Sequence, residues 1–398
     1  MTAHRFSRGF CAALVCATVA LSCAVEPPAT ARRAPPAPIV VSPAPSTGPA
    51  PVISVTPVPV EAIPSPPVPP VSAPMPVVPP VATQPYIALL LPLETPDFRS
   101  AAEAFNNGFN AAQKVHPAPI AVRLHSTDAS PDRIAAQYKE ALANGASVVV
   151  GPMTRNGVTA LVSSALVMVP TLTLNLPENN VKMAGLYVFG LPVENEAAMV
   201  AQQMFEDRYR NVAVVNTANP VGRRMREAFL QAWRASGGNV VALSEVRSNG
   251  NLTFLRELGT SSADVVFLAA GFDEARVIRP YLPSQTAVYT TSQINLRPGD
   301  PQRDLDLDGV RFLDMPWVLS PDHPGVSIYP PAPTLSGETL RFYALGIDAY
   351  RIALALAQGE RSMEFDGVTG HIKVAPDGTI SRRPWPAAFR DGLPVLTQ

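Results

Sequence analysis

Small hydroxyl, amide and apolar side chains follow several of the strands that we expect in this 398-residue chain. In open parallel sheets, ligands bind beyond the carboxyl ends of the strands. The turn Gly151-Pro152 also opens a helix, whose first N–H groups could hold a carboxylate. We therefore predict a cleft for a small polar solute, although each hydroxyl or amide could instead be a helix cap or a turn former. The predicted cleft residues are Met153, Thr154, Thr173, Asn175, Phe272, Thr291 and Ser292.

No arrangement typical of catalysis accompanies these residues. The sequence contains no GxSxG, HExxH, GxxxxGK[ST] or GxGxxG motif. The three cysteines, Cys11, Cys16 and Cys23, all precede the expected folded region, so cysteine catalysis and thiolate metal sites are excluded there. The sequence predicts a binding protein rather than an enzyme, without catalytic residues or a cofactor.

Two charged segments invite a functional interpretation. Residues 304–309 match the first half of a calcium-binding EF-hand loop, but the twelfth position is Met315 rather than glutamate. We interpret them as a turn before a strand at residues 310–313 and predict no metal site. Arg223, Arg224 and Arg226 are interpreted as a solvated helix face, because a net charge of −1 does not favour nucleic acid as a partner.

Strands and helices that could position the cleft residues alternate from residue 86 onward. Continuous apolar runs predict strands buried on both faces, and Ser130-Pro131 predicts a helix start. This alternation is typical of right-handed parallel β/α layers, here two in succession. A helix at residues 340–357 and a hairpin around the turn 375–378 follow. The expected strands are residues 86–93, 120–124, 146–150, 169–174, 211–216, 240–246, 265–269 and 287–290.

The N-terminal segment predicts export. His4, Arg5 and Arg8 precede an apolar run that is too short to span a bilayer, so residues 1–22 are interpreted as a signal peptide. The residues up to Cys23 resemble a bacterial lipobox, which makes Cys23 the predicted lipidation site. Ordinary cleavage nearby, leaving a soluble periplasmic protein, is the alternative. Prolines recur through residues 23–85, which predicts a disordered, proline-rich tether.

Five stretches of the folded region resemble a known family by their order and spacing. They include Val148-Val149-Val150 before Gly151-Pro152, and Gly346-Ile347-Asp348-Ala349-Tyr350 in a late helix. Together they span most of residues 86–398 and resemble the C-terminal domain of the penicillin-binding protein activator (LpoA, also called LppC) family. The stretches are residues 87–93, 149–154, 289–293, 307–317 and 343–350.

The resemblance implies the fold of a type I periplasmic binding protein. This is an α/β fold with two Rossmann-like lobes, parallel sheets and a cleft between them. The chain would cross between the lobes near residues 191–192, within 317–335 and near 365–370. Lobe 1 would comprise about 86–191 and 336–364, and lobe 2 about 192–317 and 366–398.

The resemblance also implies a function. It predicts an outer-membrane lipoprotein, facing the periplasm, that binds and activates a class A penicillin-binding protein in peptidoglycan synthesis. Larger members of the family carry an N-terminal helical-repeat domain, and here the proline-rich tether stands in its place. The alternative is a periplasmic solute-binding protein for an amino-acid-like ligand, serving an importer or a sensor. The expected partners are thus the synthase, the outer membrane through a lipid anchor, and a possible small molecule in the cleft.

Overall fold

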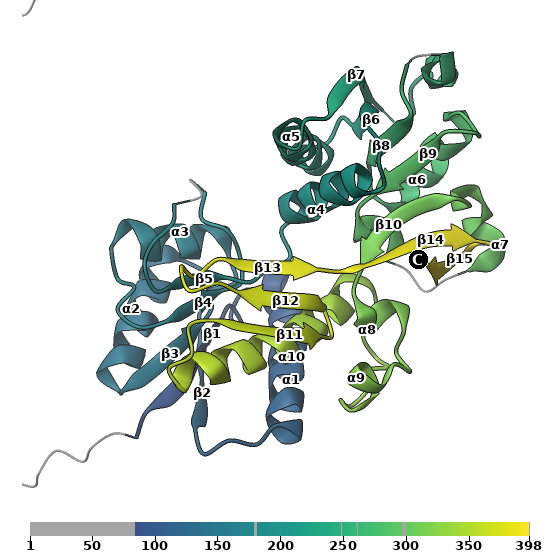
Figure 1. Cartoon of the computed structure of the whole chain (residues 1–398). Helices are drawn as coiled ribbons and strands as arrows, with labels where there is room; N and C mark the ends of the chain where they lie inside the picture. The colour runs from purple at the N-terminus through teal and green to yellow at the C-terminus, as the bar shows by residue number, and fades with distance from the viewer. Residues whose placement is uncertain (1–83, 179–180, 248, 261, 297–299, 398) are drawn as a thin grey trace, which may run out of the picture. The chain divides into compact units, whose positions relative to one another are not determined.

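The computed structural model describes residues 84–397 except 179–180, 248, 261 and 297–299 (Figure 1). These residues belong to one compact unit, Val77–Gln398. The predicted signal peptide, Cys23 and all but the last two residues of the predicted tether lie outside the described residues. Within the described part of the chain, no helix is both long enough and apolar enough to cross a membrane.

The first sheet is entirely parallel and has the strand order β2-β1-β3-β4-β5. All six residues of its central strand β1 are buried, as the continuous apolar run predicts for a strand covered on both faces. The strand β5 was not predicted, because three residues carry too little periodicity to be recognised. The strands are β1 (Tyr86–Leu91), β2 (Ala121–Ser126), β3 (Ala146–Val150), β4 (Thr171–Thr173) and β5 (Leu186–Val188).

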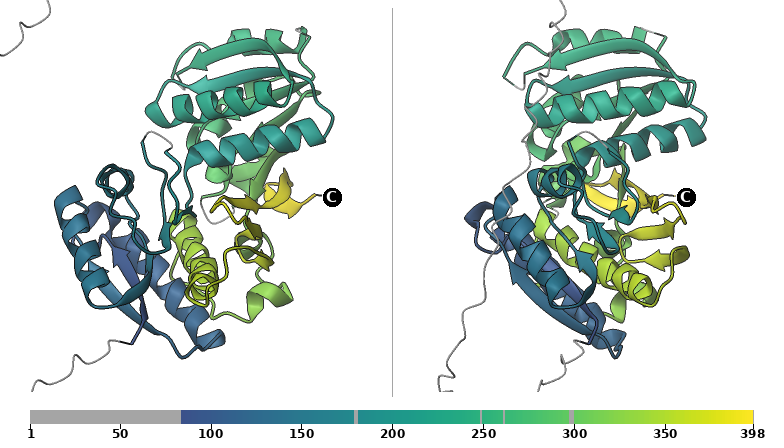
Figure 2. Two further views of the ribbon diagram at one scale, coloured as in Figure 1. Left: turned by 60° about the vertical axis from the view of Figure 1, so that its left-hand side comes forward. Right: turned by 90° about the vertical axis from the view of Figure 1, so that its left-hand side faces the viewer.

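Helices lie beside the first sheet, as the ribbon views show (Figure 2). The predicted start of α2 is confirmed, since Pro131 lies in its first turn and the Ser130 hydroxyl accepts a hydrogen bond from the Arg133 N–H at 3.4 Å. The helices are α1 (Pro96–Val115), α2 (Pro131–Ala143), α3 (Arg155–Ser163) and α10 (Gly337–Ala357).

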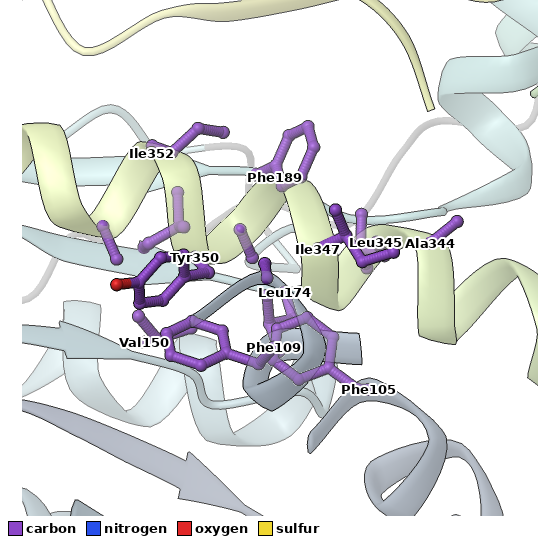
Figure 3. Packing of buried hydrophobic residues seen from close by; sticks show 14 of the residues in the cluster. Phe105, Phe109, Val150, Leu174, Phe189, Ala344, Leu345, Ile347, Tyr350 and Ile352 are labelled. Carbon is purple, nitrogen blue, oxygen red and sulfur yellow. The ribbon is translucent and has the colours of Figure 1, made fainter. Parts of the chain in front are cut away.

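Helices α1 and α10 approach each other closely because glycines lie between them. A Cβ atom at Gly108 would lie 1.9 Å from the carbonyl oxygen of Tyr343, and one at Gly346 would lie 2.1 Å from that of Phe105. Figure 3 shows apolar side chains of both helices, including Phe105 and Tyr350, in the core that these helices share with the first sheet. Helices α1 and α10, which lie more than 200 residues apart in the sequence, therefore pack directly against each other in one core.

The second sheet has seven strands in the order β15-β14-β10-β9-β8-β6-β7. Five of them are parallel, as predicted, but β14 and β15 are antiparallel and were not predicted. Pro386 and Pro394 lie in these two strands, and proline within a run argues against a strand. The strands are β6 (Asn211–Thr217), β7 (Asn239–Val246), β8 (Val265–Ala269), β9 (Ala287–Thr290), β10 (Val310–Asp314), β14 (Trp385–Arg390) and β15 (Leu393–Leu396).

Helices pack against both faces of this second sheet. Val212 and Val214 of β6 share a core with Phe229 and Trp233 of α5, while Val215 faces a separate core that includes α6. The longer helices are α4 (Val193–Glu206), α5 (Pro220–Ala235) and α6 (Phe272–Ile278), and a short one is α7 (Pro301–Asp304). Two further short helices, α8 (Pro316–Leu319) and α9 (Pro324–Ser327), place Trp317 and Val326 in the core of α1 and α10.

A third, antiparallel sheet of order β11-β12-β13 lies between α10 and the second sheet in the sequence. The predicted hairpin is confirmed as β12 (Gly370–Val374) paired with β13 (Ile380–Arg383), and β11 (Met363–Gly367) adds to it. Ile372 and Val374 pack into the core of α1 and α10.

The places where the chain leaves one sheet for another can be compared with the predicted crossings. β5 ends at Val188 and α4 begins at Val193, on either side of the predicted residues 191–192. After β10 the chain runs through α8 and α9 to α10, within the predicted second crossing. Residues 363–383 pair among themselves, and the chain joins the seven-stranded sheet for the last time at Trp385. The residue ranges of the two lobes stay a prediction.

Candidate functional site

Four predicted cleft residues come together where β3 and β4 end. The Thr154 hydroxyl accepts a hydrogen bond from the Gly157 N–H at 3.3 Å and caps α3. The Asn175 side-chain amide donates to the carbonyl oxygen of Met153 at 3.2 Å, and the Thr173 hydroxyl donates to that of Asn175 at 3.2 Å. These polar groups therefore hold two neighbouring strand ends together, which is the cap and turn role that the sequence left open.

The other three predicted residues belong to the second sheet. Phe272 begins α6 and is 6% exposed, packed in the apolar core on one face of that sheet. The Thr291 hydroxyl lies 3.4 Å from the sulfur of Met225. The Ser292 hydroxyl donates to the Glu196 carboxylate at 2.8 Å. Phe272 is thus a core residue, and the two hydroxyls are already hydrogen-bonded.

Thr291 and Ser292 line a small cavity of about 10 Å³. A single water molecule needs about that much space, whereas small-molecule pockets measure roughly 300–1,000 Å³. The cavity therefore has room for about one water and not for an amino acid. Its remaining lining consists of Glu196, Met199, Val200, Leu313, Asp314, Met315, Arg382 and Pro384.

A buried ion pair beside this cavity was not predicted from the sequence. Arg341 and Asp314 are each 2% exposed, and the Arg341 guanidinium binds the Asp314 carboxylate through two nitrogens, with Nε 3.0 Å from Oδ1. Arg341 also donates to the carbonyl oxygen of Asn295 at 3.0 Å, and the Asn295 amide donates back to Asp314 at 2.9 Å. The pair joins α10, which packs on the first sheet, to the end of β10 in the second.

Glu196 is the second buried acid of this cluster. Burial raises the pKa of its carboxyl, and the hydrogen bond from Ser292 and the positive charges of Arg382 and Arg341 oppose that rise. Among the described residues, the Nη1 atom of Arg382 is buried without a hydrogen-bond partner. We define the buried ionic cluster as Glu196, Ser292, Asp314, Arg341 and Arg382. No local sequence motif predicts this cluster, because its five residues come from five separate segments of the chain.

Another ionic contact joins the two sheets at the start of α3. The Arg155 guanidinium lies 2.9 Å from the Glu194 carboxylate on α4, and that of Arg224 on α5 lies 3.7 Å from it. The neighbouring arginine Arg223 pairs with Glu245 at 2.7 Å. These arginines therefore lie in ion pairs with the protein's own carboxylates.

Residues 304–309, which match the first half of an EF-hand loop, make contacts that stabilise neighbouring parts of the fold. The Asp308 carboxylate accepts hydrogen bonds from the N–H groups of Asp391 at 3.2 Å and Gly392 at 2.8 Å, which holds the turn between β14 and β15. Asp306 pairs with Arg276 at 3.0 Å. The predicted strand after this turn is confirmed as β10.

Comparison with protein families gives a clear match. Residues 81–258 and 256–392 match the family model described as LppC putative lipoprotein. The chain belongs to this LppC family. Relatives include the penicillin-binding protein activator LpoA of Serratia proteamaculans, 26% identical over 69% of this chain and 47% of the relative, and that of Vibrio cholerae, 27% identical over 74% and 55%. The LppC chain described here spans about half the length of these curated relatives.

Solved structures confirm the predicted type I periplasmic binding protein fold. The C-domain of LpoA from Haemophilus influenzae, titled a regulator of PBP1A, has a TM-score of 0.67 at 21% identity and covers 79% of this chain and 100% of that one. A Chromobacterium violaceum protein titled a putative branched-chain amino acid ABC transporter has a TM-score of 0.65 at 36% identity and covers 77% and 100%. The LppC chain thus shares its α/β architecture with proteins of both titles.

Proposed function

We propose that this LppC protein binds a class A penicillin-binding protein and activates it in peptidoglycan synthesis. Support comes from relatives that are named penicillin-binding protein activators, and from the C-domain titled a regulator of PBP1A, whose whole length this chain covers. The observation that carries the proposal is the water-sized cavity at the predicted cleft residues. It argues against a solute enclosed at those residues, while a separate cavity of about 630 Å³ lies beside β10 and β14, lined by polar groups such as Asp207 and Arg311.

Activation would follow from differential binding. A protein that binds the active conformation of the synthase more tightly than the inactive one shifts the synthase toward the active state. No catalytic group of this chain is needed for such a mechanism. The protein would act as a regulator and not as an enzyme.

The test is a glycan-polymerisation assay with the purified class A synthase of the same organism. We expect a complex at micromolar concentration and a faster polymerisation rate when the LppC protein is added. A mixture that shows neither a complex by analytical ultracentrifugation nor a change in rate would refute the proposal.

The same proposal includes the anchor. Residues 1–22 would be removed as a signal peptide, and acyl chains on Cys23 would hold the protein in the outer membrane, facing the periplasm. Residues 27–85 would then act as a tether, with an extended limit of roughly 180 Å at about 3.1 Å per residue. In a Cys23→Ser variant, we expect the protein to move from the membrane fraction to the soluble periplasmic fraction. Retention of that variant in the outer membrane would argue against lipidation at Cys23.

A second candidate function is binding of an amino-acid-like solute. The 36% identity to the Chromobacterium violaceum protein, titled a putative branched-chain amino acid ABC transporter, favours it. A ligand at 100 times its Kd would stabilise the protein by about 2.7 kcal/mol. A thermal-shift screen with amino acids therefore separates the two functions, and the small cavity leads us to expect no shift.

A further inference from the structure

Strand β7 forms one edge of the seven-stranded sheet, and its outer side is unpaired among the described strands. We propose that β7 is a docking edge, to which an extended, uncharged segment of a partner protein adds as a further strand. The proposal rests on the proposed function, because the partner would be the class A synthase. It names the surface and the mode of that interaction.

The first argument compares β7 with the other sheet edges in the described residues. Proteins protect exposed edges with short strands, charged side chains or proline. β7 has eight residues, more than any other described strand, contains no proline and carries one charged residue, Glu245. The other edges are protected by Arg123 and His125 in β2, by the three-residue length of β5, by Pro394 in β15, by Glu364 and Asp366 in β11, and by Arg383 in β13.

The second argument concerns the backbone groups that β7 offers. The Ala218 N–H donates to the Val246 carbonyl at 2.9 Å, so that carbonyl faces β6. Because backbone groups alternate between the two sides of a strand, the N–H and C=O groups of Leu243 and Glu245 face outward. An added strand would pair with these groups, as in other complexes formed by strand addition.

The third argument is the chemistry of the side chains along this edge. Val241 is 36% exposed and Leu243 is 53% exposed, so the edge presents apolar surface to solvent. Glu245 stays ionised, since hydrogen bonds from Arg223 and Asn216 lower its pKa to about 2, and its charge is paired within the chain by Arg223 at 2.7 Å and Arg226 at 3.3 Å. The edge therefore offers no unpaired charge, and it fits a neutral strand with apolar side chains at alternate positions.

The fourth argument excludes one occupant from within the chain. Prolines recur throughout residues 27–85. Proline has no backbone N–H and is poorly tolerated in a paired strand. The longest uncharged run without proline in this segment is residues 52–56, five residues against the eight of β7, so a strand from another protein is the occupant that fits the whole edge.

The experiment measures binding of the full mature chain to the purified class A synthase. Leu243→Pro removes an outward N–H while leaving the pairing with β6, and Leu243→Lys places a charge at the edge. Leu124→Lys is the matched control, since Leu124 lies in the edge strand β2 and is 47% exposed. We expect both Leu243 variants to raise Kd by about tenfold or more and the control to change it less than about twofold. In the wild-type complex, the amides of Leu243 and Glu245 should gain protection from hydrogen exchange.

The outcomes separate this inference from the proposed function. If the wild type binds the synthase while both Leu243 variants bind equally well, or if the β7 amides gain no protection, the docking edge is refuted and the proposed function stands. If the wild-type protein does not bind the synthase, both the docking edge and the proposed function are refuted. If the chain alone forms a dimer that Leu243→Lys dissociates, a second copy occupies the edge and the inference is wrong. If Leu243→Pro fails to fold by circular dichroism, the Leu243→Lys variant decides.

Discussion

Two groups of side chains both pair a basic residue with carboxylates, but one group is buried and the other is exposed to solvent. In the buried ionic cluster, Arg341 and Asp314 are almost fully enclosed and bind each other, and Arg341 also binds the backbone carbonyl of Asn295. On the three-stranded sheet, His371 lies between Asp366 at 2.7 Å and Glu364 at 3.0 Å, and its side chain is 45% exposed. Water screens the exposed group, whereas the buried pair loses its hydration and depends on its partners. Similar ion-pair distances in the two groups therefore do not imply similar losses of stability when a pair is broken.

The largest effect is expected from breaking the buried pair. Asp314→Ala leaves the Arg341 guanidinium buried without its counter-charge, which costs about 3–5 kcal/mol in comparable sites. The free energy of unfolding in urea would measure this loss. The double variant Asp314→Leu with Arg341→Met is the control, and it should recover much of the stability because the two charges of the pair are removed together. A decrease in the free energy of unfolding of less than about 1 kcal/mol, the usual contribution of an exposed ion pair, would contradict the strong dependence of this pair on its partners.

A smaller effect of opposite sign is expected at Glu196. Because burial raises the pKa of Glu196 above its unfolded value, its contribution to stability is greatest in acid and is lost as the pH rises through the folded pKa. Glu196→Gln keeps a hydrogen-bond acceptor for Ser292 without the charge that burial disfavours, so it should raise the free energy of unfolding at neutral pH. Unfolding measured from pH 4 to pH 8 should show less pH dependence in the variant. Destabilisation at neutral pH would show that attraction to Arg382 outweighs desolvation.

The smallest effect is expected in the exposed group. Hydrogen bonds to Asp366 and Glu364 raise the pKa of His371 above its ordinary value of 6.5. Its stabilisation is therefore fully present below that value and is lost as the pH rises through the folded pKa. The difference in Tm between wild type and His371→Gln should shrink over this pH range and also in 1 M salt. A difference that persists in high salt would contradict the contrast between the two groups.

Several elements could be predicted because their signals are local. The strand β3 was predicted with its observed ends, and the Ser130 cap before Pro131 defines the start of α2. The cleft residues stay a prediction. Thr154 and Asn175 do lie together at adjacent strand ends, yet they bond to the chain itself, and Phe272 lies in the core.

The sequence by itself determined where most of the longer strands and helices form, because burial on one or two faces leaves its period in neighbouring residues. The tertiary structure alone decided which distant charges meet. Ser292 and Glu196 are 96 residues apart in the chain, and Arg341 and Asp314 are 27 apart, so no local pattern links them. It also decided that β14 and β15 complete the second sheet and that β7 is left at its edge. The hydrophobic pattern within a segment predicts that it forms a strand. It does not predict which other strand it pairs with, because pairing depends on hydrogen bonds between distant segments.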